Sequence, residues 1–173
     1  KPGGARTQWQ AARGPIAAAP RGSRRDKPWR ARGAPRRGTP AAAVRPGAIT
    51  DDAIDRCFPV MAQLRPHLAR ASFATQVCRQ RAGGYQLAYL EDGDTIHTVA
   101  GFRVEEKLAH GVRLYIDDLV TDAQARSGGD GAAMLAWLTD FAREHGCASL
   151  ALDSGVQRGR AHRFYCTRGL QIS

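Results

Sequence analysis

Three consecutive segments of alternating polar and apolar residues, followed by a glycine-rich loop and a helix, constrain the fold of this chain most strongly. The alternation predicts three strands, at residues 85–90, 95–104 and 112–120. Residues 91–94 have the composition of a hairpin turn between the first two strands. Helical periodicity then extends over 132–145, where apolar residues form one stripe. This order predicts an antiparallel meander joined to a β-α-β unit.

The remaining segments complete this pattern on both sides. They predict a strand at 42–45, helices at 50–65 and 68–81, a strand at 147–152, a helix at 160–167 and a strand from Leu170. The order β-α-α-β-β-β-α-β-α-β indicates an α+β fold with a mixed, mainly antiparallel sheet flanked by helices. Because the sequence stops at Ser173, we expect the last strand or strands to be truncated, leaving an exposed sheet edge.

The positive charge of the chain is confined to its beginning. The whole net charge of +10 arises in residues 1–40, which contain 11 Lys/Arg and one Asp. Residues 41–173 contain 15 positively and 15 negatively charged residues. The first segment is rich in Ala, Arg, Gly and Pro, so we expect 1–40 to be disordered and 41–173 to be the folded domain. Three origins stay open for 1–40: a basic arm for a polyanion, an organelle transit peptide, or translated upstream sequence from GC-rich DNA. We expect catalysis to be independent of these residues and nucleic acid to bind through them or not at all.

Several classes of protein are not expected from this composition. No run of 18 apolar residues and no secretory leader are evident, so we expect a cytoplasmic protein without membrane contact. The four cysteines lack metal-ligand or redox spacing, so we expect neither a metal nor a disulfide; they are Cys57, Cys78, Cys147 and Cys166.

The glycine loop at 124–131 joins a strand end to a helix start. Backbone N–H groups and the positive end of the helix dipole converge at such a junction, and glycines let a bulky anion approach. The loop therefore predicts a phosphate or pyrophosphate site, with a plain surface turn as the alternative. It has neither the Walker nor the dinucleotide pattern.

Three motifs in register now carry a resemblance to the GCN5-related N-acetyltransferase (GNAT) superfamily. Arg126-x-x-Gly129-x-Gly131 resembles its CoA-binding motif, and Ala161-x-x-Phe164-Tyr165-x-x-x-Gly169-Leu170 resembles its closing signature. Val44-Arg45-Pro46 followed by Asp51-Asp52-Ala53 is similar to its opening strand and helix, and 152–158 to a bacterial single-domain branch. The chain departs from the pattern at Ser127, Asp130 and Arg158, where Gly, an apolar residue and Asn are usual.

The resemblance implies transfer of an acetyl group from acetyl-CoA to a primary amine of a small molecule or protein, in a ternary complex. It also implies which backbone groups bind the co-substrate: Leu119 and Val120 beside the thioester, and Arg126, Ser127, Gly128, Gly129, Gly131 and Ala132 at the pyrophosphate. A non-catalytic CoA-binding module and a polyanion-binding protein remain the alternatives, and a homodimer stays open.

The same resemblance assigns two catalytic candidates. Tyr165 is expected to be the general acid for the departing thiolate, with a packed phenol as the alternative. Asp117 is expected to be the general base or amine-binding carboxylate. Neighbours on a regular strand face opposite ways, so Asp118 is expected to point away from the cleft. Direct attack by a neutral amine without a base also remains open.

Overall fold

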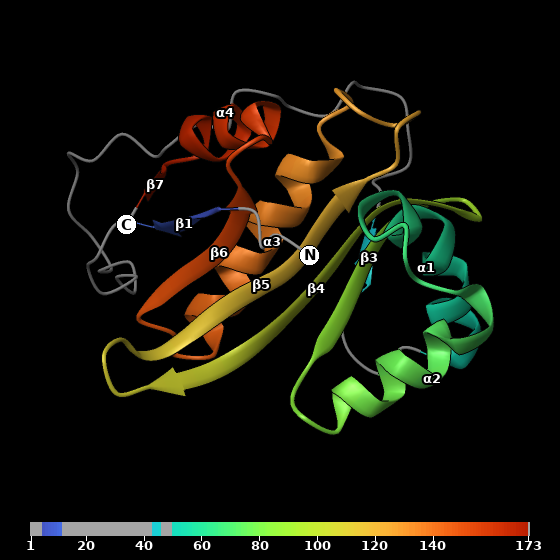
Figure 1. Cartoon of the computed structure of the whole chain (residues 1–173), viewed down its shortest axis with the longest axis horizontal. Coiled ribbons are helices and arrows are strands. Elements are labelled where there is room, and N and C mark those ends of the chain that lie inside the picture. The colour runs from blue at the N-terminus through green and yellow to red at the C-terminus, as the bar shows by residue number, and fades with distance from the viewer. Residues whose placement is uncertain (1–4, 12–42, 46–49, 173) are drawn as a thin grey trace.

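The computed structural model describes residues 5–11, 43–45 and 50–172, which form a seven-stranded sheet with helices on both faces (Figure 1). The strands are β1 (Arg6–Ala11), β2 (Ala43–Arg45), β3 (Gln86–Asp92), β4 (Thr95–Lys107), β5 (Gly111–Thr121), β6 (Ser149–Gly155) and β7 (Leu170–Ile172). Their spatial order is β2-β3-β4-β5-β6-β1-β7, and β5 and β6 run parallel, whereas the other neighbours are antiparallel. The predicted α+β class with a mainly antiparallel mixed sheet is confirmed.

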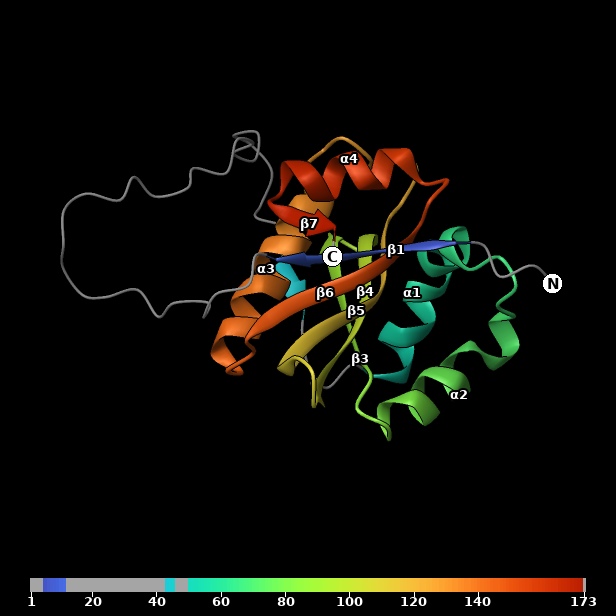
Figure 2. The same cartoon turned by 60° about the vertical axis from the view of Figure 1, so that its left-hand side comes forward.

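Two helices cover each face of the sheet (Figure 2). They are α1 (Asp51–Leu64) and α2 (Arg70–Arg81) on one face, and α3 (Asp130–Glu144) and α4 (Gly159–Thr167) on the other. The Thr50 hydroxyl caps α1 by accepting a hydrogen bond from the Ala53 amide at 3.3 Å. The cap satisfies one of the free N–H groups of the first turn, as expected from Thr at this position.

A separate apolar core stabilises each face. Beneath α3 and α4, the buried side chains include Met134, Leu138 and Leu114, and beneath α1 and α2 they include Ile54 and Phe73. Since each helix contributes one apolar stripe, its opposite side stays in water. The two cores hold β5 firmly on both sides and so fix the strand that carries the candidate site.

The strand β1 lies between β6 and β7, although it comes from the segment that was expected to be disordered. Arg6 pairs with Gly155 on β6, and Trp9 pairs with Ile172 on β7. Trp9 is only 1% exposed and belongs to the core beneath α4. The expected disorder of residues 1–40 is therefore wrong at 6–11, because one buried tryptophan and hydrogen bonds to two strands outweigh the polar composition. Residues 1–4 and 12–40 lie outside the described residues.

This placement also changes two other expectations. The neighbour of β6 is β1 rather than a strand from the end of the sequence, and β7 forms the edge of the described sheet. The domain boundary at residue 40 does not hold for β1, which is part of the folded sheet. Independence of catalysis from residues 1–40 is accordingly no longer expected.

Candidate active site

A pocket of about 840 Å³ opens where β5 and β6 separate. The last pair between these parallel strands joins Ile116 to Leu152, and both residues line the pocket. Beyond that pair, β6 continues beside β1, while β5 continues beside β4. The separation therefore exposes the facing edges of both strands. The lining of the pocket includes residues of α1 and α2 as well as Tyr165 of α4.

A β-bulge in β5 places two neighbouring aspartates in this pocket. Gly101 of β4 pairs with Asp118, but the next residue, Phe102, pairs with Ile116, so Asp117 has no partner opposite it. The extra residue shifts the alternation of the strand. Both Asp117 and Asp118 line the pocket, and the expectation that they face opposite ways is wrong.

Each of the two carboxylates is held by an arginine. Arg103 Nε lies 2.9 Å from Asp117 Oδ2, and Arg65 Nε lies 2.7 Å from Asp118 Oδ1. Arg65 also donates to the Asp117 carbonyl at 3.1 Å, which ties α1 to the bulge. Burial raises the pKa of Asp117, whereas the ion pair with Arg103 lowers it. Asp117 is thus a more basic carboxylate than its ion pair alone would make it.

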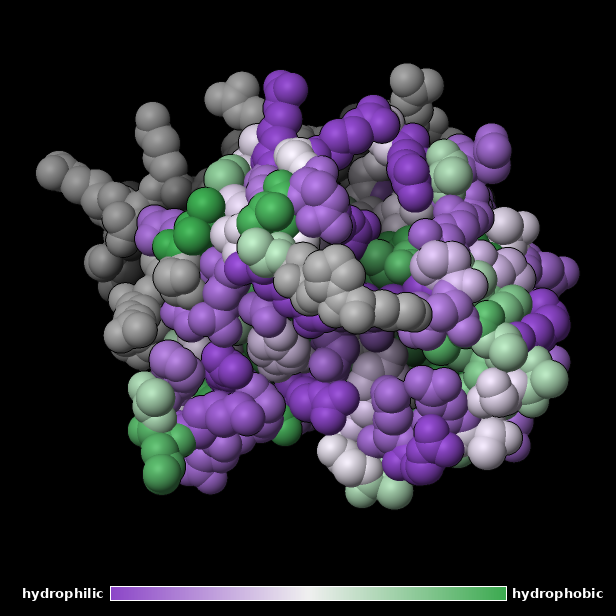
Figure 3. Space-filling view, viewed as in Figure 1, coloured by the Kyte–Doolittle hydropathy of each residue, from purple (hydrophilic) through white to green (hydrophobic). Residues whose placement is uncertain are grey.

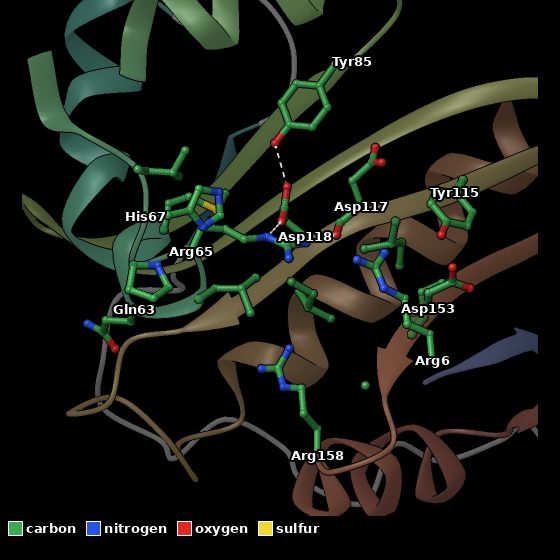
Figure 4. Close-up of a pocket in the computed structure, with 18 of the residues that line it drawn as sticks. Arg6, Gln63, Arg65, His67, Tyr85, Tyr115, Asp117, Asp118, Asp153 and Arg158 are labelled. Atoms are coloured by element: carbon green, nitrogen blue, oxygen red, sulfur yellow. Dashed lines mark hydrogen bonds and ion pairs between the residues drawn. The ribbon is translucent and has the colours of Figure 1, made fainter. Parts of the chain in front are cut away.

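Tyr85 completes the support of Asp118. Its hydroxyl donates to Asp118 Oδ2 at 3.2 Å (Figure 4). Its ring fills the space above Gly101, where any Cβ would overlap the phenol. Burial, and next the charge of Asp118, raise the pKa of Tyr85 well above its ordinary value. Tyr85 therefore stays protonated and remains a donor to Asp118.

The predicted acid, Tyr165, lies on the far wall of the same pocket. It is 7% exposed, and its ring centroid is 5.9 Å from that of Trp9. Burial raises the pKa of Tyr165, and the nearby charge of Arg158 lowers it. The phenol therefore carries its proton at neutral pH, while Arg158 is placed to stabilise the phenolate if the proton leaves.

The glycine loop follows β5 and is not among the segments that line the pocket. Gly129, immediately before α3, has φ of +106°, and Ser127 has φ of +70°. A side chain at Gly129 would meet nothing within 4 Å, so the backbone there is open to a ligand. At Gly131, by contrast, a Cβ would lie 3.0 Å from Thr121 Oγ1, and the small residue lets α3 approach β5.

The loop amides are not equally available for an anion. Ala132 N–H donates to the Gly129 carbonyl at 2.9 Å, and Gly128 N–H donates to Ala125 at 3.4 Å. Asp130 pairs with His97 Nδ1 at 3.2 Å, which holds this carboxylate towards β4. The unusual acid in the motif is thereby accounted for.

The other residues named from the sequence are divided between pocket and core. Leu119 lines the pocket, whereas Val120 is 7% exposed and packs in the core beneath α1 and α2. The Arg126 side chain folds back to donate to the Thr121 carbonyl at 3.3 Å.

The polar residues of the pocket that sequence reasoning missed include Arg6, Arg65, Tyr85, Arg103, Tyr115 and Asp153. Asp153 could have been found, since it follows an apolar run at the carboxyl end of a strand, where sites of α/β units gather. The others depend on pairing between distant segments. Among the described residues, no group of three His, Cys, Asp or Glu is arranged to hold a metal, and no helix is long and apolar enough to cross a membrane.

The sequence profile of the Acetyltransferase (GNAT) family matches residues 50–170. This chain belongs to the GNAT family. It is 36% identical over 110 residues to the uncharacterised N-acetyltransferase YhdJ of Bacillus subtilis, spanning 62% of this chain and 77% of that protein.

The GNAT fold is also evident in solved structures. A Trypanosoma brucei acetyltransferase has a TM-score of 0.62 at 20% identity, covering 76% of this chain and 94% of its own. The aminoglycoside N-acetyltransferase AAC(6')-Iy in complex with CoA has a TM-score of 0.63 at 10% identity, covering 75% and 89%.

Proposed function

We propose that this GNAT chain transfers an acetyl group from acetyl-CoA to a primary amine within a ternary complex. The observation that carries the proposal is the separation of β5 and β6 after Ile116 and Leu152. It joins the carboxylates of β5 and the phenol of α4 in one pocket, so that an amine and a thioester could meet between them.

The residues of the loop fit a pyrophosphate. The backbone at Gly129 is open, and the N-terminus of α3 favours negative charge. We propose that the amides of 126–131 other than Gly128 bind the phosphates, and that the N–H groups of Leu119 and Val120 polarise the carbonyl. The Gly128 and Ala132 amides are not part of this set, because they already donate to the carbonyls of Ala125 and Gly129. Acetyl-CoA supplies a thioester, whose carbonyl carbon accepts the amine.

The two catalytic residues act on opposite sides of the new bond. Asp117 takes a proton from the ammonium group, and the neutral nitrogen then bonds to the carbonyl carbon. As the carbon–sulfur bond breaks, Tyr165 gives its proton to the departing thiolate, and the nitrogen releases a second proton to water. Arg158 stabilises the phenolate until the solvent reprotonates it.

The first test addresses the loop. Ser127 is exposed and already adopts a positive φ without being glycine, so a longer side chain adds no new backbone strain. We expect Ser127→Glu to weaken acetyl-CoA binding about tenfold or more, and the neutral Ser127→Gln to keep it. Thermal shift on addition of acetyl-CoA measures this. Equal shifts in both variants would show that the loop is not the phosphate site.

The second test addresses the chemistry. A screen of amines with acetyl-CoA, read as release of free thiol, separates an enzyme from a non-catalytic CoA-binding module. Tyr165→Phe keeps the ring against Trp9, so we expect kcat to fall about 10²–10⁴-fold with acetyl-CoA affinity unchanged. A near-normal kcat with the best acceptor would remove Tyr165 from the mechanism.

A further inference from the structure

The pocket as a whole carries more positive than negative side chains. Four arginines and three aspartates line it: Arg6, Arg65, Arg103, Arg158, Asp117, Asp118 and Asp153. Two of the arginines neutralise two of the aspartates, through Arg65 with Asp118 and Arg103 with Asp117. The described contacts contain no ion pair for the remaining three, so their charges are available to a ligand. Figure 3 views this face and shows hydrophilic residues over the central strands.

Asp153 stands at the point where the strands separate. It directly follows Leu152, the last residue of β6 that pairs with β5. Tyr115 on β5 is its neighbour, and burial, followed by the interaction with the Asp153 carboxylate, raises the pKa of Tyr115 to about 12. Asp153 itself is exposed to solvent. Figure 4 shows Asp117 and Asp153 on either side of Tyr115, so two carboxylates flank the opening.

Arg6 is the neighbour of Asp153 across the β1–β6 ladder. Arg6 pairs with Gly155, and Gln8 pairs with Asp153, so Arg6 and Asp153 project from the same face of the sheet. Diagonal neighbours of this kind have Cα atoms about 7–8 Å apart. An unpaired cation and an unpaired carboxylate therefore lie side by side at the pocket, without an ion pair between them among the described contacts. Arg158 is not counted with Arg6 and Asp153, because its charge acts on Tyr165 and lowers the pKa of that phenol.

From this arrangement we infer that the acceptor is a zwitterion of the amino-acid type, an amine with a carboxylate on the neighbouring carbon. The ammonium group lies between Asp153 and Asp117, and the carboxylate pairs with the Arg6 guanidinium. Bidentate pairing with a carboxylate suits the fork of an arginine. A polycation such as a polyamine would find no excess of carboxylates here, because the lining is net positive.

The inference rests on the proposed acetyl transfer and deepens it by naming the acceptor class. It also gives β1 a part in specificity. The residue that selects the carboxylate comes from the beginning of the chain, whereas the residues that act on the amine come from β5 and β6.

The test compares amino acids with the same molecules lacking the carboxylate: L-leucine with 3-methylbutylamine, and L-phenylalanine with 2-phenylethylamine, with spermidine as the polycation. Release of thiol from acetyl-CoA gives kcat/KM for each. We expect the wild type to favour the amino acids by about tenfold or more, and Arg6→Gln to abolish that preference while changing the plain amines less than about twofold. Asp153→Asn should lower kcat/KM for both members of each pair. Arg79→Gln, which removes an exposed arginine of α2 outside the pocket, is the matched control and should change neither.

Three results would overturn the inference: plain amines or spermidine as the better substrates, an equal loss of both classes in Arg6→Gln, or a normal rate with both classes in Asp153→Asn. Acetyl-CoA binding separates the inference from the proposed function. If acetyl-CoA stabilises the protein but the amino acids neither react nor add to that stabilisation, the acceptor class is wrong and co-substrate binding stands. If acetyl-CoA itself gives no stabilisation, the proposed function is wrong as well.

Discussion

Replacing Trp9 with alanine tests whether β1 belongs to the sheet. Trp9 is 1% exposed and contacts His162 and Tyr165, with ring centroids 5.3 Å and 5.9 Å away. Removing a buried tryptophan typically lowers the free energy of unfolding by about 3–5 kcal/mol. For a domain of this size, that corresponds to a fall in Tm of roughly 6–20 °C. Since Tyr165 loses the ring that packs against it, we also expect kcat to fall.

A milder substitution of Trp9 distinguishes the contribution of aromatic packing to stability from that of the indole N–H. The Trp9 Nε1 atom is buried without a hydrogen-bond partner among the described residues, so its loss is not expected to destabilise the fold. Trp9→Phe keeps an aromatic ring beside Tyr165 and should lose less than half as much stability as Trp9→Ala. Gln8→Ala lies on the other face of the strand and should change stability by less than about 1 kcal/mol.

Urea unfolding followed by circular dichroism measures all three variants, with acetyl transfer assayed in parallel. If Trp9→Ala stays within about 1 kcal/mol of the wild type, the residue is not in the core and β1 is not between β6 and β7. If Gln8→Ala is as damaging as Trp9→Ala, the faces of β1 are reversed.

Three further predictions follow from the backbone and the buried acids. Gly101→Ala should lower the free energy of unfolding by about 1–3 kcal/mol in urea unfolding, because a Cβ overlaps both the hydroxyl and the ring of Tyr85. In a Tyr85→Ala background, which removes the ring, the same substitution should cost less, and an equal cost would mean that another contact is responsible. Ser127→Gly should raise the free energy of unfolding by about 0.5–1 kcal/mol, because it removes a side chain from a residue with positive φ. Gly129→Ala should lower the free energy of unfolding, because it adds a side chain to such a residue. A gain in both variants, or a loss in both, would contradict these backbone angles. Burial raises the pKa of the Cys57 thiol from its ordinary 9.0 to about 12. Below pH 9 the thiol is protonated in both the folded and the unfolded chain, so its contribution to the free energy of unfolding is complete. Between pH 9 and 12 it ionises in the unfolded chain first, and the free energy of unfolding falls by up to about 1.4 kcal/mol per pH unit. The urea midpoint should therefore fall less steeply above pH 9 in Cys57→Ala, and an unchanged slope would argue against a buried thiol.

Local sequence patterns are sufficient to predict some of the secondary structure. Alternation, turn residues and one apolar stripe predict the strands β3, β4 and β5 and the helix α3. By contrast, β1 could not be predicted, because six residues with a single large apolar side chain gain their stability from strands near the other end of the chain. Composition averaged over 1–40 conceals such a segment.

The candidate site was predictable in its residue types more than in its geometry. Tyr165 and Asp117 were named from motifs, and both line the pocket, but their catalytic roles remain predictions. The bulge that turns Asp118 inwards depends on how β4 and β5 pair, which no local pattern encodes. For the same reason, the hydrogen bonds of Arg65 and Tyr85 to Asp118 could not be predicted from the sequence, because they join residues that are far apart along the chain.

The position of β1 also determines the order in which the molecule can be completed during synthesis. Its partners on β6 begin only with Ala151, and the strand on its other side ends at Ile172. A ribosome adds roughly 5–20 residues per second, so β1 waits on the order of 10 s for β6 to be made. During that time Trp9 has no core to enter, and contacts of such long sequence separation form late in folding. We therefore expect closure of the sheet around β1 to follow the synthesis of β6 and β7.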